Sequence, residues 1–227
     1  GETTLSKGFL EFIDTAIERD CARNIVLEFH SNCTKFTNKL MNKLNQFREL
    51  RINASIDSIY KNYDYMRYPM TWDKLSNSLH NYLDKNQRPG TISFNPVLTA
   101  LNAHSILDLY HYELTLAAKY RRQELLWVLW IDLLWPEDKY INIKFLPQHI
   151  KKDLIQLYTE INAKLVLDFS CNIDNIIAFL NQHLELEITE QHRVNMLREI
   201  TAFDKSRDQC YNDYLHPSII EFLETPL

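Results

Sequence analysis

Apolar residues follow two kinds of spacing along this chain. In longer segments they recur every three or four positions, as Leu75, Leu79 and Leu83 do, which is the period of one face of an α-helix. In shorter runs, β-branched and aromatic residues dominate and turn-forming residues border the run. The first spacing predicts helices over residues 5–19, 36–47, 72–85, 104–120, 148–165, 173–184, 189–206 and 217–223. The second predicts strands over residues 24–29, 51–56, 91–96 and 125–131, and a further extended piece over 140–147.

The order of these segments predicts the class of fold. Helices and strands alternate up to residue 147, and such alternation is typical of a parallel sheet with helical crossovers. Residues 125–131 are apolar at every position, as expected of a strand that is buried on both faces. We therefore expect an α/β protein with a partial (β/α) barrel over residues 1–147. Residues 148–227 are expected to form a helical C-terminal extension packed on the barrel. An all-α bundle is the alternative.

Composition narrows the classes of function. The chain has 227 residues, of which 45% are hydrophobic and 24% charged, as in ordinary globular proteins. Its net charge of −5 argues against binding to nucleic acid, and no apolar run approaches the roughly 20 residues that cross a bilayer. Four scattered cysteines predict reduced thiols in a cytoplasmic protein. Three glycines are too few for a glycine-rich phosphate loop.

Candidate chemistry concentrates in residues 51–72. Ser55 and Asp57 come at the end of a predicted strand, and Arg67 follows in a tyrosine-rich segment before Pro69. Parallel α/β folds build ligand sites from polar groups at the carboxyl ends of their strands. The tyrosines between these residues are expected to pack the loop rather than to line a pocket.

This segment resembles the fourth-strand region of radical S-adenosylmethionine (radical SAM) enzymes, in which a strand ending in Ser-Ile-Asp leads into a Tyr-x-x-x-Arg-Tyr-Pro loop. The resemblance implies that Ser55 and Asp57 contact the methionine or ribose portion of S-adenosylmethionine. It also implies that Arg67 binds the methionine carboxylate, for which a planar guanidinium is well suited.

Other segments resemble the same family in the same order. Gly1-Glu2-Thr3 is similar to the end of its Gly-Gly-Glu-Pro motif, which implies that Glu2 holds the cofactor's amino group; a helix-start acid is the alternative. The segment 29–34 is similar to the third-strand tip, with Ser31 and Asn32 as cofactor contacts. Asn95 matches a fifth-strand contact, although a turn-forming Asn before proline explains it equally well. The segment 200–217 is similar to the closing Asp-x-x-Arg helix of a subgroup with a short C-terminal extension.

The family's metal site is missing from this chain. Radical SAM enzymes hold a [4Fe–4S] cluster with Cys-x-x-x-Cys-x-x-Cys, whereas the gaps between the cysteines here are 12, 138 and 39 residues. We expect the cluster-binding section to lie upstream of Gly1, so that the chain is a piece of a longer protein. The strand over 24–29 would then be an open apolar edge, covered by a missing N-terminal segment or by a partner chain.

Three functions remain open. The resemblance implies an oxidoreductase that uses a 5′-deoxyadenosyl radical to abstract hydrogen from an unknown small molecule or peptide. A non-catalytic scaffold or binding protein on the same fold is the second. The third is a helical ribonuclease with Arg23 and His30 as its active pair.

Overall fold

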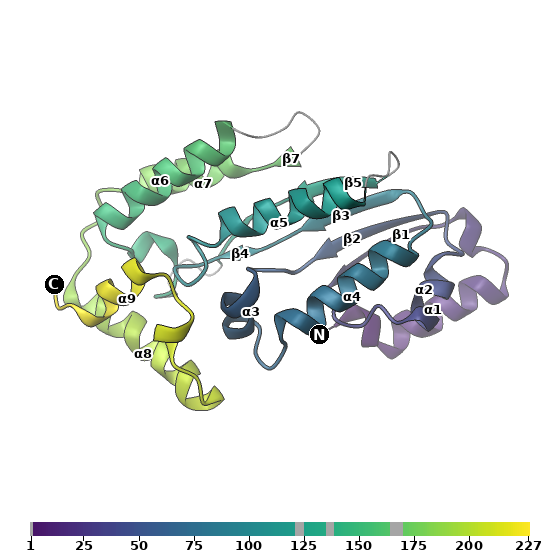
Figure 1. The fold of residues 1–227 in the computed structure, drawn as a ribbon, viewed down its shortest axis with the longest axis horizontal. Helices are drawn as coiled ribbons and strands as arrows, with labels where there is room; N and C mark the ends of the chain where they lie inside the picture. Colours follow the sequence, from purple (N-terminus) through teal and green to yellow (C-terminus); the bar gives the residue numbers. More distant parts are fainter. Residues whose placement is uncertain (1, 121–124, 135–138, 164–169) are drawn as a thin grey trace.

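The computed structural model describes residues 2–120, 125–134, 139–163 and 170–227. Its centre is a parallel five-stranded sheet with the strand order β1-β2-β3-β5-β7, joined by helices (Figure 1). The predicted α/β class, with parallel strands in a partial (β/α) barrel and helices after it, is confirmed, and the all-α alternative is wrong. The strands of this sheet are β1 (Val26–Ser31), β2 (Glu49–Ala54), β3 (Gly90–Phe94), β5 (Leu125–Leu129) and β7 (Ser170–Cys171).

The helices follow the predicted periodicity closely. The segment predicted over 72–85 is one helix with those bounds, and it buries Leu75, Leu79 and Leu83 on one side. The α-helices are α1 (Lys7–Glu18), α2 (Asn38–Leu44), α3 (Tyr60–Met66), α4 (Trp72–Lys85), α5 (Ile106–Lys119), α6 (Gln148–Ala163), α7 (Ile173–Gln182), α8 (Glu190–Arg207) and α9 (Pro217–Glu224). Short 3₁₀ turns are η1 (Thr3–Leu5), η2 (Ala22–Asn24), η3 (Ile143–Phe145) and η4 (Tyr211–Asp213).

Several local predictions were wrong. The tyrosine-rich segment is not a loop but contains α3. The piece over 140–147 is not an extended strand, because its centre is η3. The sequence pattern missed a small second sheet, in which β4 (Val97–Leu98) pairs in parallel with β6 (Asp132–Leu133). It also missed β7, which lies between two predicted helices of the C-terminal extension and pairs with β5.

Only one face of the sheet carries the core. Along β1 and β2 buried residues alternate with exposed ones, so that Leu27 and Leu50 face the core. The opposite face presents Glu28 and Arg51, which are paired in the strand register, to solvent. β1 lies at the edge of the described sheet, as expected, but this edge strand is not apolar throughout, because half of its side chains point to the polar face.

Residues 125–131 were predicted to be buried on both faces of the sheet. The side chains that the structure describes in this segment do not confirm this prediction. Val128 is half-buried, and Trp130 is 45% exposed. Leu129 and Ile131 are fully buried. This segment therefore has one core face, like its neighbours β1 and β2. The side chains of residues 125–127 lie outside the description.

The start of β3 depends on a glycine. Gly90 pairs with Leu50 of β2 and has a φ of 152°. A Cβ atom built on it would lie 1.6 Å from the Leu50 carbonyl oxygen. Backbone therefore occupies the space that any other side chain would need.

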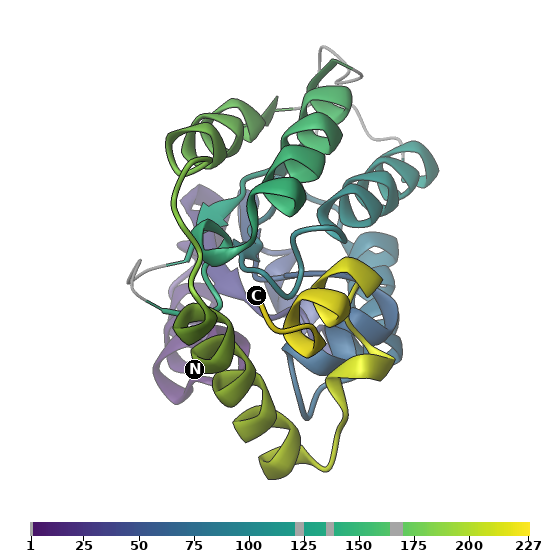
Figure 2. The same cartoon turned by 90° about the vertical axis from the view of Figure 1, so that its left-hand side faces the viewer.

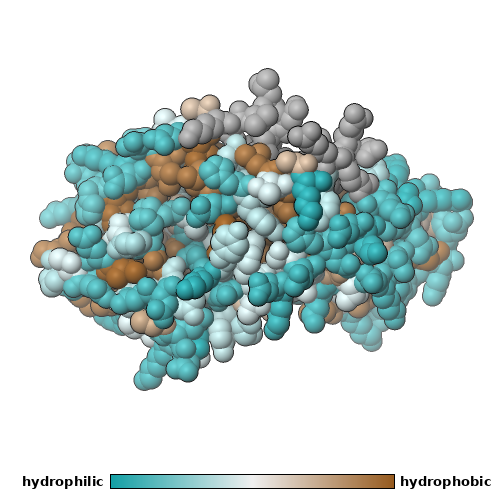
Figure 3. Space-filling view, in the orientation of Figure 1, coloured by the Kyte–Doolittle hydropathy of each residue, from teal (hydrophilic) through white to brown (hydrophobic). Residues whose placement is uncertain are grey.

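The last helices reach the middle of the fold. In Figures 1 and 2 α8 and α9 lie next to each other at one end of the molecule, and α8 contacts α3 through the hydrogen bond from the Tyr65 hydroxyl to Asp204. The visible outer surface is mostly hydrophilic, and apolar patches gather over α6, α7 and α9 (Figure 3). In the described ranges, no helix has both the length and the apolar character needed to cross a membrane.

Candidate functional site

Polar side chains from four separate segments meet at the carboxyl ends of β1 and β2. The two strand ends are tied together by the Ser55 amide, which donates to the Ser31 carbonyl at 2.9 Å. Next to this contact lies a cavity of about 270 Å³. Its lining residues are Glu2, His30, Ser31, Asn32, Ser55 and Arg67.

Glu2 is fixed at one side of this cavity by hydrogen bonds. Its Oε1 accepts from the Thr4 amide at 3.0 Å, from the Thr4 hydroxyl at 2.5 Å and from the Ser31 hydroxyl at 2.7 Å. Its Oε2 accepts from the Asn32 amide at 2.6 Å. Partial burial of the carboxylate favours its neutral form, but these donors outweigh that effect and lower the pKa of Glu2. Glu2 is therefore a pre-oriented anion, and Oε2 accepts one of these four hydrogen bonds while Oε1 accepts three.

The turn after β1 holds Ser31 and Asn32 in place. The Ser31 hydroxyl accepts from the Cys33 amide at 2.9 Å, and the Asn32 side chain accepts from the Thr34 amide at 3.2 Å. Cys33 has a left-handed φ of 58°, the conformation for which glycine is usual, and its side chain is fully buried. Burial, with a smaller contribution from Glu2, raises the pKa of this thiol. Cys33 therefore shapes the turn as a neutral side chain.

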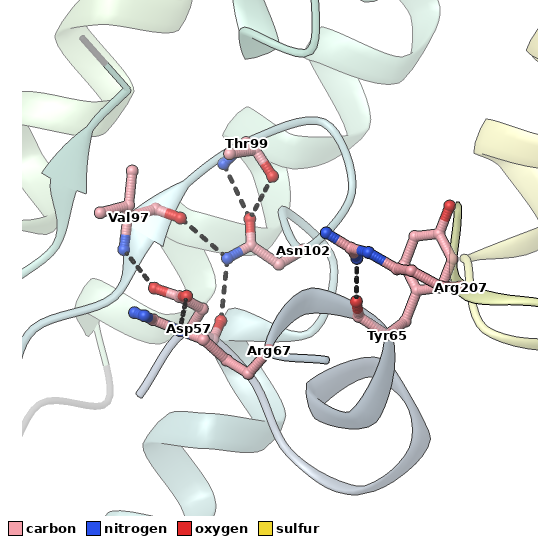
Figure 4. A network of polar contacts seen from close by, with 7 residues as sticks. All are labelled: Asp57, Tyr65, Arg67, Val97, Thr99, Asn102 and Arg207. Atoms are coloured by element: carbon pink, nitrogen blue, oxygen red, sulfur yellow. Dashed lines mark hydrogen bonds and ion pairs between the residues drawn. The ribbon is translucent and has the colours of Figure 1, made fainter. Parts of the chain in front are cut away.

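Arg67 enters the cavity from the end of α3. Its Nε lies 2.5 Å from Oδ2 of Asp57, which is 6% exposed (Figure 4). The other Asp57 oxygen accepts from the Val97 amide at 2.9 Å. The Asp57 carbonyl accepts from the Asn102 side chain at 2.8 Å. Asp57 is thus anchored to the chain after β3 and holds one edge of the guanidinium. The two terminal nitrogens of Arg67 make no hydrogen bond with another residue of the described chain.

The structure brings five of the seven predicted site residues to one cavity; Asp57 and Asn95 are outside its lining. Asp57 faces Arg67 instead. The Asn95 amide donates to the Ala54 carbonyl at 2.8 Å, and its side-chain oxygen is buried without a hydrogen-bond partner in the described chain.

Two residues of this region were missed. His30 lines the cavity, and its position next to Ser31 at a strand end could have indicated this. Asn102 binds the Asp57 carbonyl, and no local signal in the sequence reveals this contact.

Tyr60, Tyr63 and Tyr65 were predicted to pack the segment rather than to line a pocket. This prediction was right for two of the three. Tyr63 and Tyr65 are each 1% exposed, whereas Tyr60 is 60% exposed. Tyr63 contacts Trp72 edge-on, with ring centroids 5.7 Å apart. Tyr63 and Tyr65 therefore anchor α3 in the core, and neither lines the cavity.

The charges in the cavity define what it can bind. Glu2 offers an anionic acceptor and Arg67 a cationic donor, and Ser31 and Ser55 belong to the same lining. An α-amino acid carries the complementary pair, an ammonium and a carboxylate. The volume of about 270 Å³ is just below the roughly 300–1,000 Å³ of most ligand pockets. A cavity with this volume and these charges is suited to a small zwitterionic group.

The described residues do not fit an iron–sulfur cluster. No group of three or more His, Cys, Asp or Glu side chains among them is placed to hold a metal ion. Cys33 is buried, while Cys21 and Cys210 are exposed at other places in the fold. A cluster needs several converging thiolates, so no step through one is derived from these residues.

The proposed ribonuclease pair is not assembled. Arg23 lies in η2 before β1 and pairs with Asp20 at 2.6 Å, whereas His30 is near the far end of β1. A strand rises about 3.3 Å per residue, so the length of β1 separates the two side chains. The ribonuclease hypothesis also assumed a helical protein, and the parallel sheet excludes that fold.

The fold and the site together define an α/β protein with a polar cavity at the carboxyl end of a parallel sheet. No protein-family model and no curated protein matches the chain. A solved structure with some similarity is that of SuiB from Streptococcus suis bound to the precursor peptide SuiA, with a TM-score of 0.47 and 12% sequence identity. The match covers 95% of this chain and 44% of that chain, so this chain spans less than half of its length.

Proposed function

We propose that this chain binds S-adenosylmethionine through the cavity lined by Glu2, Ser31, Asn32, Ser55 and Arg67. In this proposal Oε2 of Glu2 accepts from the ammonium of the methionine portion, and the free nitrogens of Arg67 bind its carboxylate. The hydroxyl of Ser55 and the side-chain amide of Asn32 supply further polar contacts. Asp57 holds Arg67 in position, and Asn95 contacts the part of the cofactor outside the cavity.

One observation carries the proposal. Glu2 and Arg67 are far apart in the sequence, and they come from motifs that resemble two different cofactor contacts of radical SAM enzymes. Both line the same cavity. Chance similarity in short motifs gives no reason for the two residues to meet, whereas a shared ligand does.

The wider activity rests on the resemblance. S-adenosylmethionine can supply a 5′-deoxyadenosyl radical for hydrogen abstraction, which defines an oxidoreductase of the radical SAM class. We propose this activity for an assembly in which thiolates from outside the described residues hold the [4Fe–4S] cluster. A small molecule or a peptide would then lie on the exposed polar face of the sheet, next to His30.

Binding of S-adenosylmethionine to the purified chain, measured by isothermal titration calorimetry, tests the proposal. Arg67→Met should weaken binding by roughly 10- to 150-fold, because a hydrogen bond to a charged group contributes about 1.5–3 kcal/mol. The matched control is Arg48→Met, since the exposed Arg48 lies away from the cavity. Absence of binding to the parent chain, or equal loss in both variants, would contradict the proposal.

A non-catalytic binding protein on the same fold is the second candidate. It is favoured by the lack of cluster ligands among the described residues. Anaerobic reconstitution with iron and sulfide, followed by electron paramagnetic resonance, separates the two. A chain that binds S-adenosylmethionine but takes up no cluster, alone or with its partners, is the binding protein.

A further inference from the structure

Helix α8 contacts the segment that presents Arg67. Two of its residues, Asp204 and Arg207, both bind Tyr65, which precedes Arg67 by two positions. The Tyr65 hydroxyl donates to Oδ1 of Asp204 at 2.8 Å, and Nη1 of Arg207 donates to the Tyr65 carbonyl at 2.8 Å. One residue of α3 is therefore held by its side chain and by its backbone from the same turn of a distant helix.

Arg207 also contacts the other side of Arg67 in the sequence. Its guanidinium lies over the ring of Tyr68, 5.8 Å from the ring centroid, and over the ring of Phe203 at 4.8 Å. Figure 4 shows the Arg207 side chain reaching the Tyr65 carbonyl. The contacts to Tyr65 and Tyr68 bracket Arg67, so the backbone that carries the guanidinium is fixed on both sides.

These contacts matter because α3 has little stability of its own. It has seven residues and no side-chain cap at its N-terminus, and isolated helices of this length do not persist in water. Arg67 is its C-terminal cap residue. A small tilt of α3 would therefore move the Arg67 side chain relative to Glu2.

The contact from α8 is itself anchored. Oδ2 of Asp204 accepts from the Tyr211 amide at 3.0 Å, and the Tyr65 ring stacks on Tyr214 with centroids 5.2 Å apart. Burial, and then the hydrogen bond to Asp204, raise the pKa of Tyr65, so this hydroxyl remains a donor. The same carboxylate therefore joins the C-terminal segment to α3.

From this geometry we infer that Asp204 and Arg207 are positioning residues for Arg67, so that α8 sets the recognition of the ligand's carboxylate. This inference rests on the proposed function. Asp57 holds Arg67 from the sheet side and the pair on α8 holds its backbone from the helical side. Neither Asp204 nor Arg207 lines the cavity.

Two ligands distinguish positioning from general stabilisation. S-adenosylmethionine carries the carboxylate, whereas its decarboxylated analogue lacks only that group. Arg207→Met should weaken binding of S-adenosylmethionine by about tenfold and should change binding of the analogue by less than about twofold. Tyr65→Phe, which keeps the packed ring and removes the bond to Asp204, should act in the same direction. Lys205→Met is the matched control on the exposed side of the same turn.

Equal weakening of both ligands, or none in either variant, would overturn the inference. A second readout does not need the ligand. The side-chain Nε–H signal of Arg67 in a ¹⁵N-correlated spectrum, assigned with Arg67→Lys, should shift or broaden in Arg207→Met and stay unchanged in Lys205→Met. If the parent chain binds neither compound, the proposed function fails, and this signal alone decides whether α8 positions Arg67. An unchanged Arg67 signal in Arg207→Met refutes the inference that α8 positions Arg67.

Discussion

Glu113 gives the sharpest quantitative prediction. It lies on the core side of α5 with no exposed surface, and both of its carboxyl oxygens are buried without a hydrogen-bond partner. Burial therefore raises the pKa of Glu113 well above its usual value of about 4.5. In the folded protein the side chain keeps its proton at a pH where the unfolded chain releases it.

The sign of the effect on stability follows from this difference. Between pH 4.5 and the folded-state pKa, the folded state binds more protons than the unfolded state, so the free energy of unfolding falls as pH rises. Each rise of one pH unit lowers the free energy of unfolding by up to about 1.4 kcal/mol. From pH 4.5 to pH 7 the loss reaches at most about 3 kcal/mol, a large part of the 5–15 kcal/mol of a typical domain.

Glu113→Gln removes this titration while keeping the shape of the side chain. Urea unfolding at a series of pH values should show little difference between variant and parent at pH 4. The variant should gain up to about 3 kcal/mol over the parent by pH 7. The contributions of the other titrating groups to the pH dependence cancel in this comparison, because the variant and the parent share those groups. The control Glu221→Gln changes an exposed carboxyl, and its curve should run parallel to that of the parent. A difference between Glu113→Gln and the parent that does not change with pH would refute the reasoning.

Two further substitutions test the surroundings of the site. Asn102 accepts from the Thr99 amide and donates to the carbonyls of Asp57 and Val97, and it is 1% exposed. Asn102→Ala should lower the free energy of unfolding by about 3 kcal/mol, because these buried groups lose their hydrogen-bond partner. Urea titrations measure this loss. A loss below about 1 kcal/mol would mean that water replaces the Asn102 amide. His104 stacks on His216, and burial followed by that neighbour lowers its pKa to about 4. The folded state favours the neutral form of His104, so the melting temperature should fall as pH drops from 6.5 towards 4. The melting temperature of His104→Phe should fall less over that range. Equal falls in the variant and the parent would count against a role for His104.

Periodicity predicted the long helices because each buries a regular apolar face. Helix α4 is the clearest case, with bounds as predicted. Helix α3 could not be found in this way, since it is short and its buried tyrosines contact residues far away in sequence, including Asp204. Strand β7 is short as well, and in the described chain it pairs with the edge of β5, a contact that no local pattern reveals.

The candidate site was predictable to the extent that parallel strands place their polar ends together. Ser55 follows directly from that rule, whereas Ser31 came from the family resemblance and proves to lie on the neighbouring strand. Arg67 came from a motif rather than from the rule. The link from Asp57 to Asn102, and the support of α3 by α8, depend on contacts between segments that share no local pattern.

The distance in sequence between Tyr65 and its two partners on α8 imposes an order on biosynthesis. The partners are 139 and 142 residues further along the chain. At roughly 5–20 residues per second, a ribosome needs about 7–28 s to make that stretch. During this time the first strands can already pair while the arginine segment has no helix behind it. In a nascent chain the first strands are therefore made before α8 is available to hold the segment that carries Arg67.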